Sequence, residues 1–422
     1  MAVWRRCSEM SEMKDSGIEW IGEIPKNKQV LRNKYMFSYE KGKLPSSTNL
    51  DKKGFAYIGA SDLDSNTNDY TNYTEDETLP NAEYDDLLVL WDGARAGLCG
   101  THKTGKISST IVKIKGDKSV FQPFLYWYYK GFEKYMYQSV SGTTIPHMNR
   151  KFIENIGFID WTIGEQQKIS AYLDRKCEKI DDIISKQKTV IEKLKEYKLS
   201  IITEAVTKGL NPDVKMKDSG VEFLGRVPDN WDIIKFGRCI SIKSNLVPPE
   251  SYYDYPQIAP DSIEKNSAKL LNYKTVRESG VISWNHLFFK GQIIYSKIRP
   301  LLNKVIIAPF DGLCSADMYP IETDNNSKYI VYIMLSDYFL TQVALLTENR
   351  VKMPKINQNE LSGIMIALPP IKEQQQIADY LDKKCSAIDK AIEKKQAIID
   401  KLTEYKKSLI YEVVTGKREC LE

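Results

Sequence analysis

One run of sequence occurs twice in this chain, and this repeat limits the folds that the chain can adopt. The first copy spans Glu165 to Lys208, the second spans Glu373 to Gly416, and without a gap the two 44-residue runs agree at 24 positions. Both open on Glu-Gln-Gln, and both carry Glu-Tyr-Lys ahead of a closing Val-Thr. A duplication of this length predicts a molecule built from two equivalent units.

Apolar side chains recur along each copy at alternating steps of four and three residues, which is the pattern of a coiled-coil helix. A 44-residue helix is about 66 Å long, longer than a small globular domain is wide. One position of each seam is polar (Gln187, Lys395), and such a residue often fixes register. The seam residues are Leu173, Cys177, Ile180, Ile184, Gln187, Ile191, Leu194, Leu381, Cys385, Ile388, Ile392, Lys395, Ile399 and Leu402.

Helix-end signals flank both copies. Thr162 and Glu165 fit a capping box, Pro370 suits an opening turn, and Gly209 and Gly416 fit helix ends. Over 150 residues separate the copies, so the chain leaves one end of the pair and returns to the other. We therefore expect the two helices to pair in antiparallel orientation. The simpler alternative is an amphipathic helix packed on a single core.

Composition narrows the class of protein. With 422 residues, 42% hydrophobic and 27% charged, and a net charge of +4, the chain fits two to four ordinary globular domains. It contains no run of eighteen apolar residues, and residues 1–12 lack the apolar core of a signal peptide, so we expect a cytoplasmic protein. The seven cysteines are scattered without a Cys-x-x-Cys pair, which predicts neither disulfides nor a metal site.

A second, shorter repeat opens each unit: Met13 to Pro25 (MKDSGIEWIGEIP) returns as Met216 to Pro228 (MKDSGVEFLGRVP). Between this anchor and the helix, β-rich stretches are followed by a helical one, which predicts mixed α/β domains. The fold class expected is α+β, with two such domains joined by an antiparallel coiled coil in a pseudo-two-fold repeat. The expected boundaries are a first domain at 1–161, a first helix at 162–210, a second domain at 211–369, and a second helix with the tail at 370–422.

The predicted strands of the two domains match in sequence order. They are GFAYIGA (54–60), DDLLVLW (85–91) and SSTIVKIKG (108–116) in the first domain, and DYPQIAP (254–260), GQIIYSKI (291–298) and NKVIIAPF (303–310) in the second. Beyond their strands the domains share little sequence. This combination suggests one scaffold that carries two different readers.

No group of residues predicts an active site. The stretch GTHKTGK (100–106) fits seven positions of a phosphate-binding loop, but Ile107 stands where Ser or Thr must hold magnesium, and a strand follows instead of a helix. His102, His147 and His286 lie in separate stretches without a second ligand or nucleophile. We therefore expect no catalytic residue, no metal site and no cofactor in this chain.

Polar loops rich in basic and amide side chains lie at matching positions of the two domains: 93–106 and 143–151 in the first, 296–304 and 348–360 in the second. Arg and Lys pair with guanine edges, Asn and Gln with adenine, and all four with phosphates. Ordinary solvated loops explain any single one, but four at duplicated positions favour DNA binding. The candidate residues are Ser61, Asp62, Arg95, Lys103, Lys106, Thr143, Thr144, His147, Asn149, Arg150, Lys151, Lys265, Lys297, Arg299, Asn303, Lys304, Arg350, Lys352, Lys355 and Asn357.

With these motifs, the chain resembles the specificity subunit of a type I restriction-modification enzyme from Met13 to Gly416. The resemblance is carried by IGEQQKISAYLDRK (163–176), PPIKEQQQIADYLDKK (369–384), the two Glu-Tyr-Lys to Val-Thr helix ends and both DSG(I/V)E anchors. One departure is that Trp161-Thr162-Ile163-Gly164 precedes the first EQQ, where the family has a Leu-Pro-Pro phrase such as that ending at Pro370.

The resemblance implies two target-recognition domains, each reading one half of a bipartite site in double-stranded DNA. It also implies that the helices separate the domains and dock two methyltransferase subunits, which restriction subunits join. S-adenosylmethionine and ATP then belong to those partners, and we expect this chain to bind neither. The competing expectation is a non-enzymatic coiled-coil adaptor that binds protein partners.

The helix seam also gives an expected length for the gap between the half-sites. From Leu173 to Leu194 it is about 32 Å at helical rise, while one turn of DNA is about 34–36 Å. Half-sites centred about one turn apart leave a spacer of roughly 5–8 unspecified base pairs.

Overall fold

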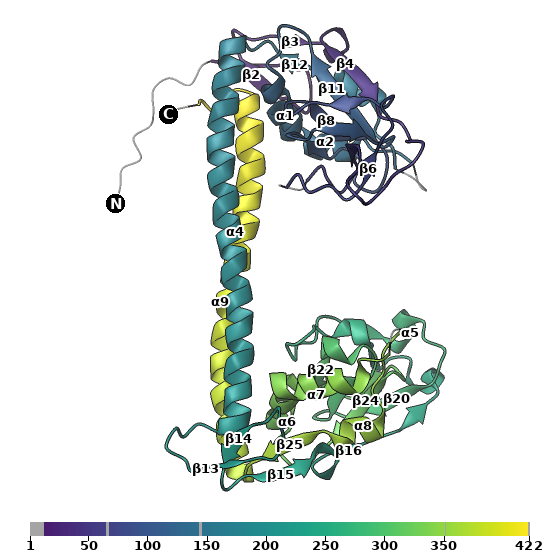
Figure 1. Ribbon diagram of the computed structural model, residues 1–422, viewed down its shortest axis with the longest axis vertical. Coiled ribbons are helices and arrows are strands. Elements are labelled where there is room, and N and C mark those ends of the chain that lie inside the picture. The colour runs from purple at the N-terminus through teal and green to yellow at the C-terminus, as the bar shows by residue number, and fades with distance from the viewer. Residues whose placement is uncertain (1–11, 65–66, 143–145, 351, 421–422) are drawn as a thin grey trace. The chain divides into compact units, whose positions relative to one another are not determined.

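The computed structural model describes residues 12–64, 67–142, 146–350 and 352–420, and it divides into two compact units. Unit 1 holds residues 1–187 and 397–422, and unit 2 holds residues 188–396. In each unit, one globular domain packs on one stretch of two long helices, α4 (Ile163–Lys208) and α9 (Ile371–Val414), which contribute to both units (Figure 1).

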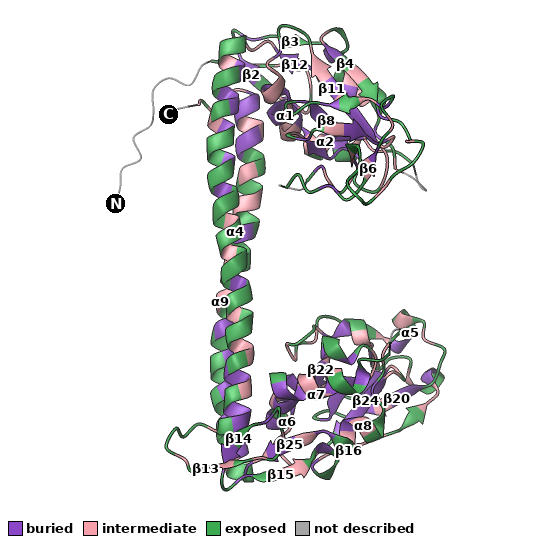
Figure 2. Ribbon diagram, viewed as in Figure 1, coloured by how far each residue is buried: buried purple, intermediate pink, exposed green. Residues whose placement is uncertain are grey.

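Within each unit α4 and α9 run antiparallel, as the repeat predicts. In unit 1 the Lys406 ammonium lies 2.6 Å from the Asp181 carboxylate, and in unit 2 Lys198 lies 2.8 Å from Asp389. These are the same ion pair in the repeat, since both partners are shifted by 208 residues. The fourteen seam residues are buried or half-buried, whereas the outward faces of the helices are exposed (Figure 2).

The helix ends carry polar and glycine signals. Thr162 and Glu165 form a reciprocal capping box, with backbone N–H to side-chain oxygen distances of 2.8 and 3.3 Å. Pro370 lies one residue ahead of α9, and its carbonyl accepts the first helical hydrogen bonds. Gly209 and Gly416 adopt φ of 74° and 75°, the left-handed conformation that ends a helix without strain on a Cβ.

Two four-stranded sheets form the first domain, in the orders β4-β11-β8-β9 and β6-β5-β10-β7. Two short strand pairs, β1-β2 and β3-β12, flank them. The strands are β1 (Met13–Asp15), β2 (Glu23–Pro25), β3 (Val30–Leu31), β4 (Phe37–Lys41), β5 (Phe55–Ile58), β6 (Tyr73–Thr74), β7 (Asn81–Ala82), β8 (Leu87–Leu90), β9 (Cys99–Gly100), β10 (Gly105–Ile107), β11 (Ile111–Gly116) and β12 (Phe158–Ile159). The helices are α1 (Gln122–Gly131), α2 (Glu133–Gln138) and α3 (Arg150–Asn155).

The second domain has sheets in the orders β16-β24-β21-β22 and β17-β20-β23-β18-β19, with the short pairs β13-β14 and β15-β25. Its strands are β13 (Met216–Asp218), β14 (Arg226–Pro228), β15 (Asp232–Lys235), β16 (Ser241–Ile242), β17 (Leu246–Val247), β18 (Pro256–Ile258), β19 (Lys274–Thr275), β20 (Asn285–Phe288), β21 (Ile293–Ser296), β22 (Val305–Ile307), β23 (Gly312–Cys314), β24 (Met318–Glu322) and β25 (Met365–Leu368). The helices are α5 (Val276–Ser279), α6 (Ser327–Leu335), α7 (Asp337–Thr347) and α8 (Gln358–Gly363).

The two domains share one strand plan. The parallel pair β5 and β10 corresponds to β18 and β23, and the sheet order β4-β11-β8-β9 corresponds to β16-β24-β21-β22. The predicted match of SSTIVKIKG (108–116) with NKVIIAPF (303–310) is therefore wrong. The counterpart of β11 is β24, and the counterpart of β22 is β9, which has only two residues and leaves no strand pattern in the sequence.

The anchor repeat forms the same hairpin in both units, β1-β2 and β13-β14. Asp15 and Asp218 each accept the N–H of the glycine two residues later, at 3.0 Å in both cases. This bond shapes the turn that buries Ile21 in unit 1 and Leu224 in unit 2 against the closing turns of a long helix. The polar Asp-Ser-Gly turn thus determines where Ile21 and Leu224 pack on the long helices.

The second residue of each Glu-Gln-Gln motif is a buried glutamine that ties the domain to its long helix. Gln166 Oε1 accepts the N–H of Phe121 at 2.7 Å, at the start of α1, and Gln374 Oε1 accepts that of Asn326 at 3.1 Å, at the start of α6. Each Nε2 donates two more hydrogen bonds, of 2.7 to 2.9 Å, to the chain before these helices and before the long helix. Because every polar atom of a buried amide is satisfied, the contact is specific as well as favourable.

An aspartate two turns further along each long helix holds the same domain helix. Asp174 accepts the indole N–H of Trp127 at 2.8 Å, and Asp382 accepts the Tyr332 hydroxyl at 2.7 Å and the Lys328 ammonium at 2.6 Å. The Gln and Asp contacts together fix the orientation of each domain on the stretch of helix in its own unit.

Among the described residues, no single helix is long and apolar enough to cross a membrane. Only α6 and α7 taken together, bent by 61°, meet the length and composition required.

We predict that Gln166→Ala lowers the free energy of unfolding by about 1–3 kcal/mol. The substitution leaves the Phe121 N–H and the Ser119 carbonyl, near the start of α1, without their hydrogen-bond partner. Urea unfolding followed by tryptophan fluorescence measures this change. Gln167→Ala is the matched control, since Gln167 is exposed in the same motif and its loss should stay within about 0.5 kcal/mol. Equal midpoints for the two variants would refute the anchoring role.

Candidate nucleic-acid interface

The predicted polar loops of each domain come together on one surface, and a backbone frame joins them. In the first domain, Gly93 N–H donates to the Pro146 carbonyl at 2.9 Å and Met148 N–H to the Trp91 carbonyl at 2.8 Å. The β8–β9 loop is thereby tied to residues 146–149.

The second domain repeats this frame. Arg299 N–H donates to the Pro354 carbonyl at 2.8 Å, and Ile356 N–H donates to the Lys297 carbonyl at 2.9 Å. The β21–β22 loop is thereby tied to residues 354–357. The two loops that the sequence singles out in each domain are therefore parts of one site, with the same pattern of backbone hydrogen bonds in both domains.

A third segment contributes to each surface. It follows β5 in the first domain and β18 in the second, which are the equivalent parallel strands. In the first domain Asp62 accepts the N–H of Gly59 at 2.7 Å, and Arg95 reaches the Ala60 carbonyl at 2.8 Å. In the second domain Lys304 donates to the Pro260 carbonyl at 2.6 Å. Ser61 is exposed on the turn between.

A carboxylate organises the cations of the first surface. Asp92 lies 2.8 Å from the Lys41 ammonium and 2.6 Å from Nδ1 of His147. Burial alone would raise the pKa of Asp92, but hydrogen bonds and charge from Lys41 and His147 hold it below the ordinary value. Lys41 also belongs to this surface but is not among the predicted residues. It lies at the end of β4, 51 residues before Asp92, so no local pattern links the two.

The second surface uses acids in the same way. Lys355, at the position equivalent to His147, lies 2.9 Å from Asp317. Arg350 binds Glu360 and the Lys355 carbonyl, and this guanidinium holds the pKa of Glu360 below its ordinary value. These cations orient the loop rather than stand free at its surface.

Two amide side chains of the predicted set act as helix caps. Asn149 accepts the N–H of Phe152 at 3.3 Å at the start of α3, and Asn357 accepts the N–H of Glu360 at 2.9 Å at the start of α8. They occupy equivalent positions, and their oxygens are engaged.

Three of the side chains predicted to lie on the surface are buried instead, and they support the fold of their domain. Lys103 donates to the Thr67 carbonyl at 2.8 Å, and burial lowers the pKa of Lys103. Lys106 donates to the carbonyls of Glu77 and Leu79 at 2.7 and 3.0 Å, and Asn303 donates to that of Met334 at 2.9 Å. Their heads brace neighbouring loops and do not reach solvent, because the three residues are only 1–3% exposed.

The remaining predicted side chains differ in how they are engaged. Arg95 and Arg150 are exposed and paired with Asp64 (2.6 Å) and Glu154 (2.7 Å), and Lys297 lies over the Tyr319 ring at 5.2 Å. Thr143 and Thr144 fall outside the described residues. In the described part of the chain, no carboxylate lies within 4 Å of the four exposed cations Lys151, Lys265, Arg299 and Lys352.

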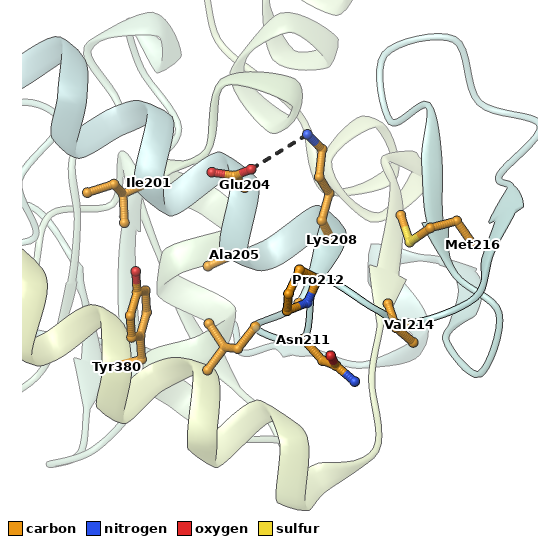
Figure 3. Close-up of a pocket in the computed structure, with 11 residues that line it drawn as sticks. Ile201, Glu204, Ala205, Lys208, Asn211, Pro212, Val214, Met216 and Tyr380 are labelled. Atoms are coloured by element: carbon orange, nitrogen blue, oxygen red, sulfur yellow. Dashed lines mark ion pairs between the residues drawn. The ribbon is translucent and has the colours of Figure 1, made fainter.

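The described residues contain no cluster of three His, Cys, Asp or Glu side chains able to hold a metal ion. The stretch that imitates a phosphate-binding loop forms β9 and β10 with a turn between them, and its His102 stacks on Tyr84. A pocket of about 520 Å³ lies where α4 ends in unit 2, but its lining is largely aliphatic with one ion pair, Glu204–Lys208 at 3.7 Å (Figure 3). This lining offers no nucleophile with a neighbouring base.

Comparison with known proteins decides the family. The model of the type I restriction modification DNA specificity domain matches residues 25–193 and again residues 228–404. The chain belongs to this family. The two matches correspond to the two halves of the internal repeat.

Known specificity subunits are similar to this one along much of their length. The EcoDI specificity subunit of Escherichia coli is 34% identical over 269 residues, which is 60% of this chain and 60% of the relative. The MjaVIII specificity subunit of Methanocaldococcus jannaschii is 25% identical over 386 residues, 85% of this chain and 86% of the relative. A chain in a solved structure of a type I R-M system has the same fold at 13% identity, with a TM-score of 0.67 over 93% of this chain and 98% of that one.

For this specificity subunit we predict that Asp92→Asn weakens the fold in a pH-dependent way. The folded pKa of Asp92 is depressed, so its stabilising contribution is complete above the unfolded value of about 4 and is lost as the pH falls through the lower folded value. Urea unfolding of both proteins from pH 7 downward should show a difference in the free energy of unfolding that shrinks below about pH 4. Asp64→Asn, which removes an exposed ion pair, is the control. A difference independent of pH would rule out the role of the Asp92 charge.

Proposed function

We propose that this chain is the non-catalytic DNA-reading subunit of a type I restriction-modification complex, with each domain reading one half of a bipartite site. The observation that carries the proposal is the duplicated surface, in which the same backbone frame presents different side chains in the two domains. His147 and Lys355, or Gly93 and Arg299, stand at equivalent places in the frame. Two readers with one frame and unlike side chains suit an asymmetric site.

We propose 1–161 and 211–369 as the two target-recognition domains, and 162–210 and 370–422 as the helical segments. The helices would set the spacer and dock two methyltransferase subunits, and restriction subunits would join through these. S-adenosylmethionine and ATP would bind the partners, and the complex would work on double-stranded DNA in the cytoplasm. Two ion pairs between the helices, one in each unit, and a seam of fourteen packed side chains support the helix pairing on which this role depends.

Replacing residues 296–304 with the matching loop of a relative should change the methylated sequence at one half-site only, since this loop belongs to the second surface alone. Sequencing of adenine methylation in DNA exposed to the complex, before and after the exchange, measures the result. A matched exchange of residues 91–98 in the first domain should change the other half-site. If either exchange alters both halves, each domain is not an independent reader.

Inserting one heptad into each long helix should lengthen the spacer by about 3 base pairs, because seven residues add about 10 Å at helical rise and DNA rises about 3.4 Å per pair. The half-sites should keep their sequences, and the same methylation assay reports both quantities. A heptad keeps the seam in register, so the control is a heptad in α9 alone, which should break the pairing. A changed half-site with an unchanged spacer would contradict the role of the helices.

A further inference from the structure

Arg299 has a strained backbone. Its φ and ψ are 44° and 55°, the left-handed region that is unfavourable for a residue with a Cβ. Pro300 follows, and a residue ahead of proline prefers an extended conformation. Strain of this kind costs about 1–3 kcal/mol and persists only where the surroundings impose it. Here the Arg299 N–H is bound to the Pro354 carbonyl at 2.8 Å, and the Arg299 carbonyl accepts the N–H of Leu302 at 2.9 Å.

The guanidinium at the end of this fixed backbone forms no ion pair with any described residue. Arg299 is exposed, and no carboxylate among the described residues lies within 4 Å of its side chain. The neighbouring cations differ, since Lys355 is bound to Asp317 at 2.9 Å and Arg350 to Glu360. Around this loop, the paired cations hold the frame while Arg299 presents its head to solvent.

The equivalent position in the first domain shows that the frame does not need an arginine. Gly93 makes the same bond, from its N–H to the Pro146 carbonyl at 2.9 Å, and adopts φ of 112°. A Cβ built on Gly93 would meet no heavy atom within 4 Å, so the space in front of the frame is open. Glycine occupies this frame with little strain, and the contribution of Arg299 therefore lies in its side chain.

We infer that Arg299 is a specificity-determining residue that reads one guanine in the half-site of the second domain. The inference rests on the proposed function. Two N–H groups of a guanidinium match O6 and N7 of guanine in the major groove, which is the commonest specific contact of an arginine. A backbone held by hydrogen bonds on both sides limits the directions the fork can take, as base readout requires. A phosphate contact needs only charge and tolerates a mobile side chain.

The test compares methylated sequences produced by the complex with its methyltransferase subunits, carrying wild-type, Arg299→Gly, Arg299→Lys or Arg226→Ala chains. Arg299→Gly should relax one G·C pair of the second half-site, with about a 5- to 150-fold loss of preference there. Its Tm should not fall, because glycine relieves the strained conformation. Arg299→Lys should reduce the preference for the same pair by less, since an ammonium can reach a guanine edge but lacks the fork. Arg226→Ala, the matched control, removes an exposed arginine of the β13–β14 hairpin outside this surface and should leave the methylated sequence unchanged.

An unchanged sequence with Arg299→Gly would overturn the inference. So would a uniform loss of affinity across all DNA sequences with a weaker salt dependence, which marks a phosphate contact. An undiminished preference for that G·C pair with Arg299→Lys would overturn the forked contact, and this measurement decides alone if Arg299→Gly does not assemble. A wild-type complex that methylates no bipartite site would instead refute the proposed function.

Discussion

A buried glutamine amide fastens each domain of this protein to its long helix, and the other features depend on that attachment. Gln166 and Gln374 each bind the first backbone N–H of a domain helix and two acceptors nearby. An amide satisfied in this way tolerates no shift of one element along the other, because a shift would leave buried polar atoms unpaired. The aspartates two turns further on, Asp174 and Asp382, add a second point of attachment, so rotation about the first is also restricted.

In the candidate DNA interface, too, polar pairing distinguishes side chains that support the fold from side chains that remain available to DNA. Most of its cations already bind groups of the protein itself. Lys106 binds backbone carbonyls, Arg350 binds Glu360, and Lys355 binds Asp317. A count of Lys and Arg in a loop therefore overstates the charge that is available to a phosphate or a base. The net charge of the whole chain, +4, is equally uninformative, because acids such as Asp92 stand within the surface itself.

Much of the architecture could be predicted from the sequence because its signals are local or periodic. Heptad spacing gives the helices, and duplication with a long connection gives their antiparallel pairing. The equivalence of the loops around Pro146 and Pro354 could be predicted because they are separated by 208 residues, as the two helix copies are. Contacts between distant parts of the chain could not be predicted. The buried Lys103 binds a carbonyl 36 residues away, and the exposed Lys41 binds an aspartate 51 residues away. The strand match failed at β9 for a related reason, because a two-residue strand has no period to detect.

The frame of backbone hydrogen bonds around Gly93 and Arg299 has a consequence for the thermodynamics of recognition. A loop that is already pinned to its neighbouring segment loses little conformational entropy when a partner binds. Affinity would then respond chiefly to the enthalpy of the contacts, and an exchanged side chain would alter which partner is preferred without altering how much order binding requires. The shape of such a surface is settled during folding, before any partner arrives.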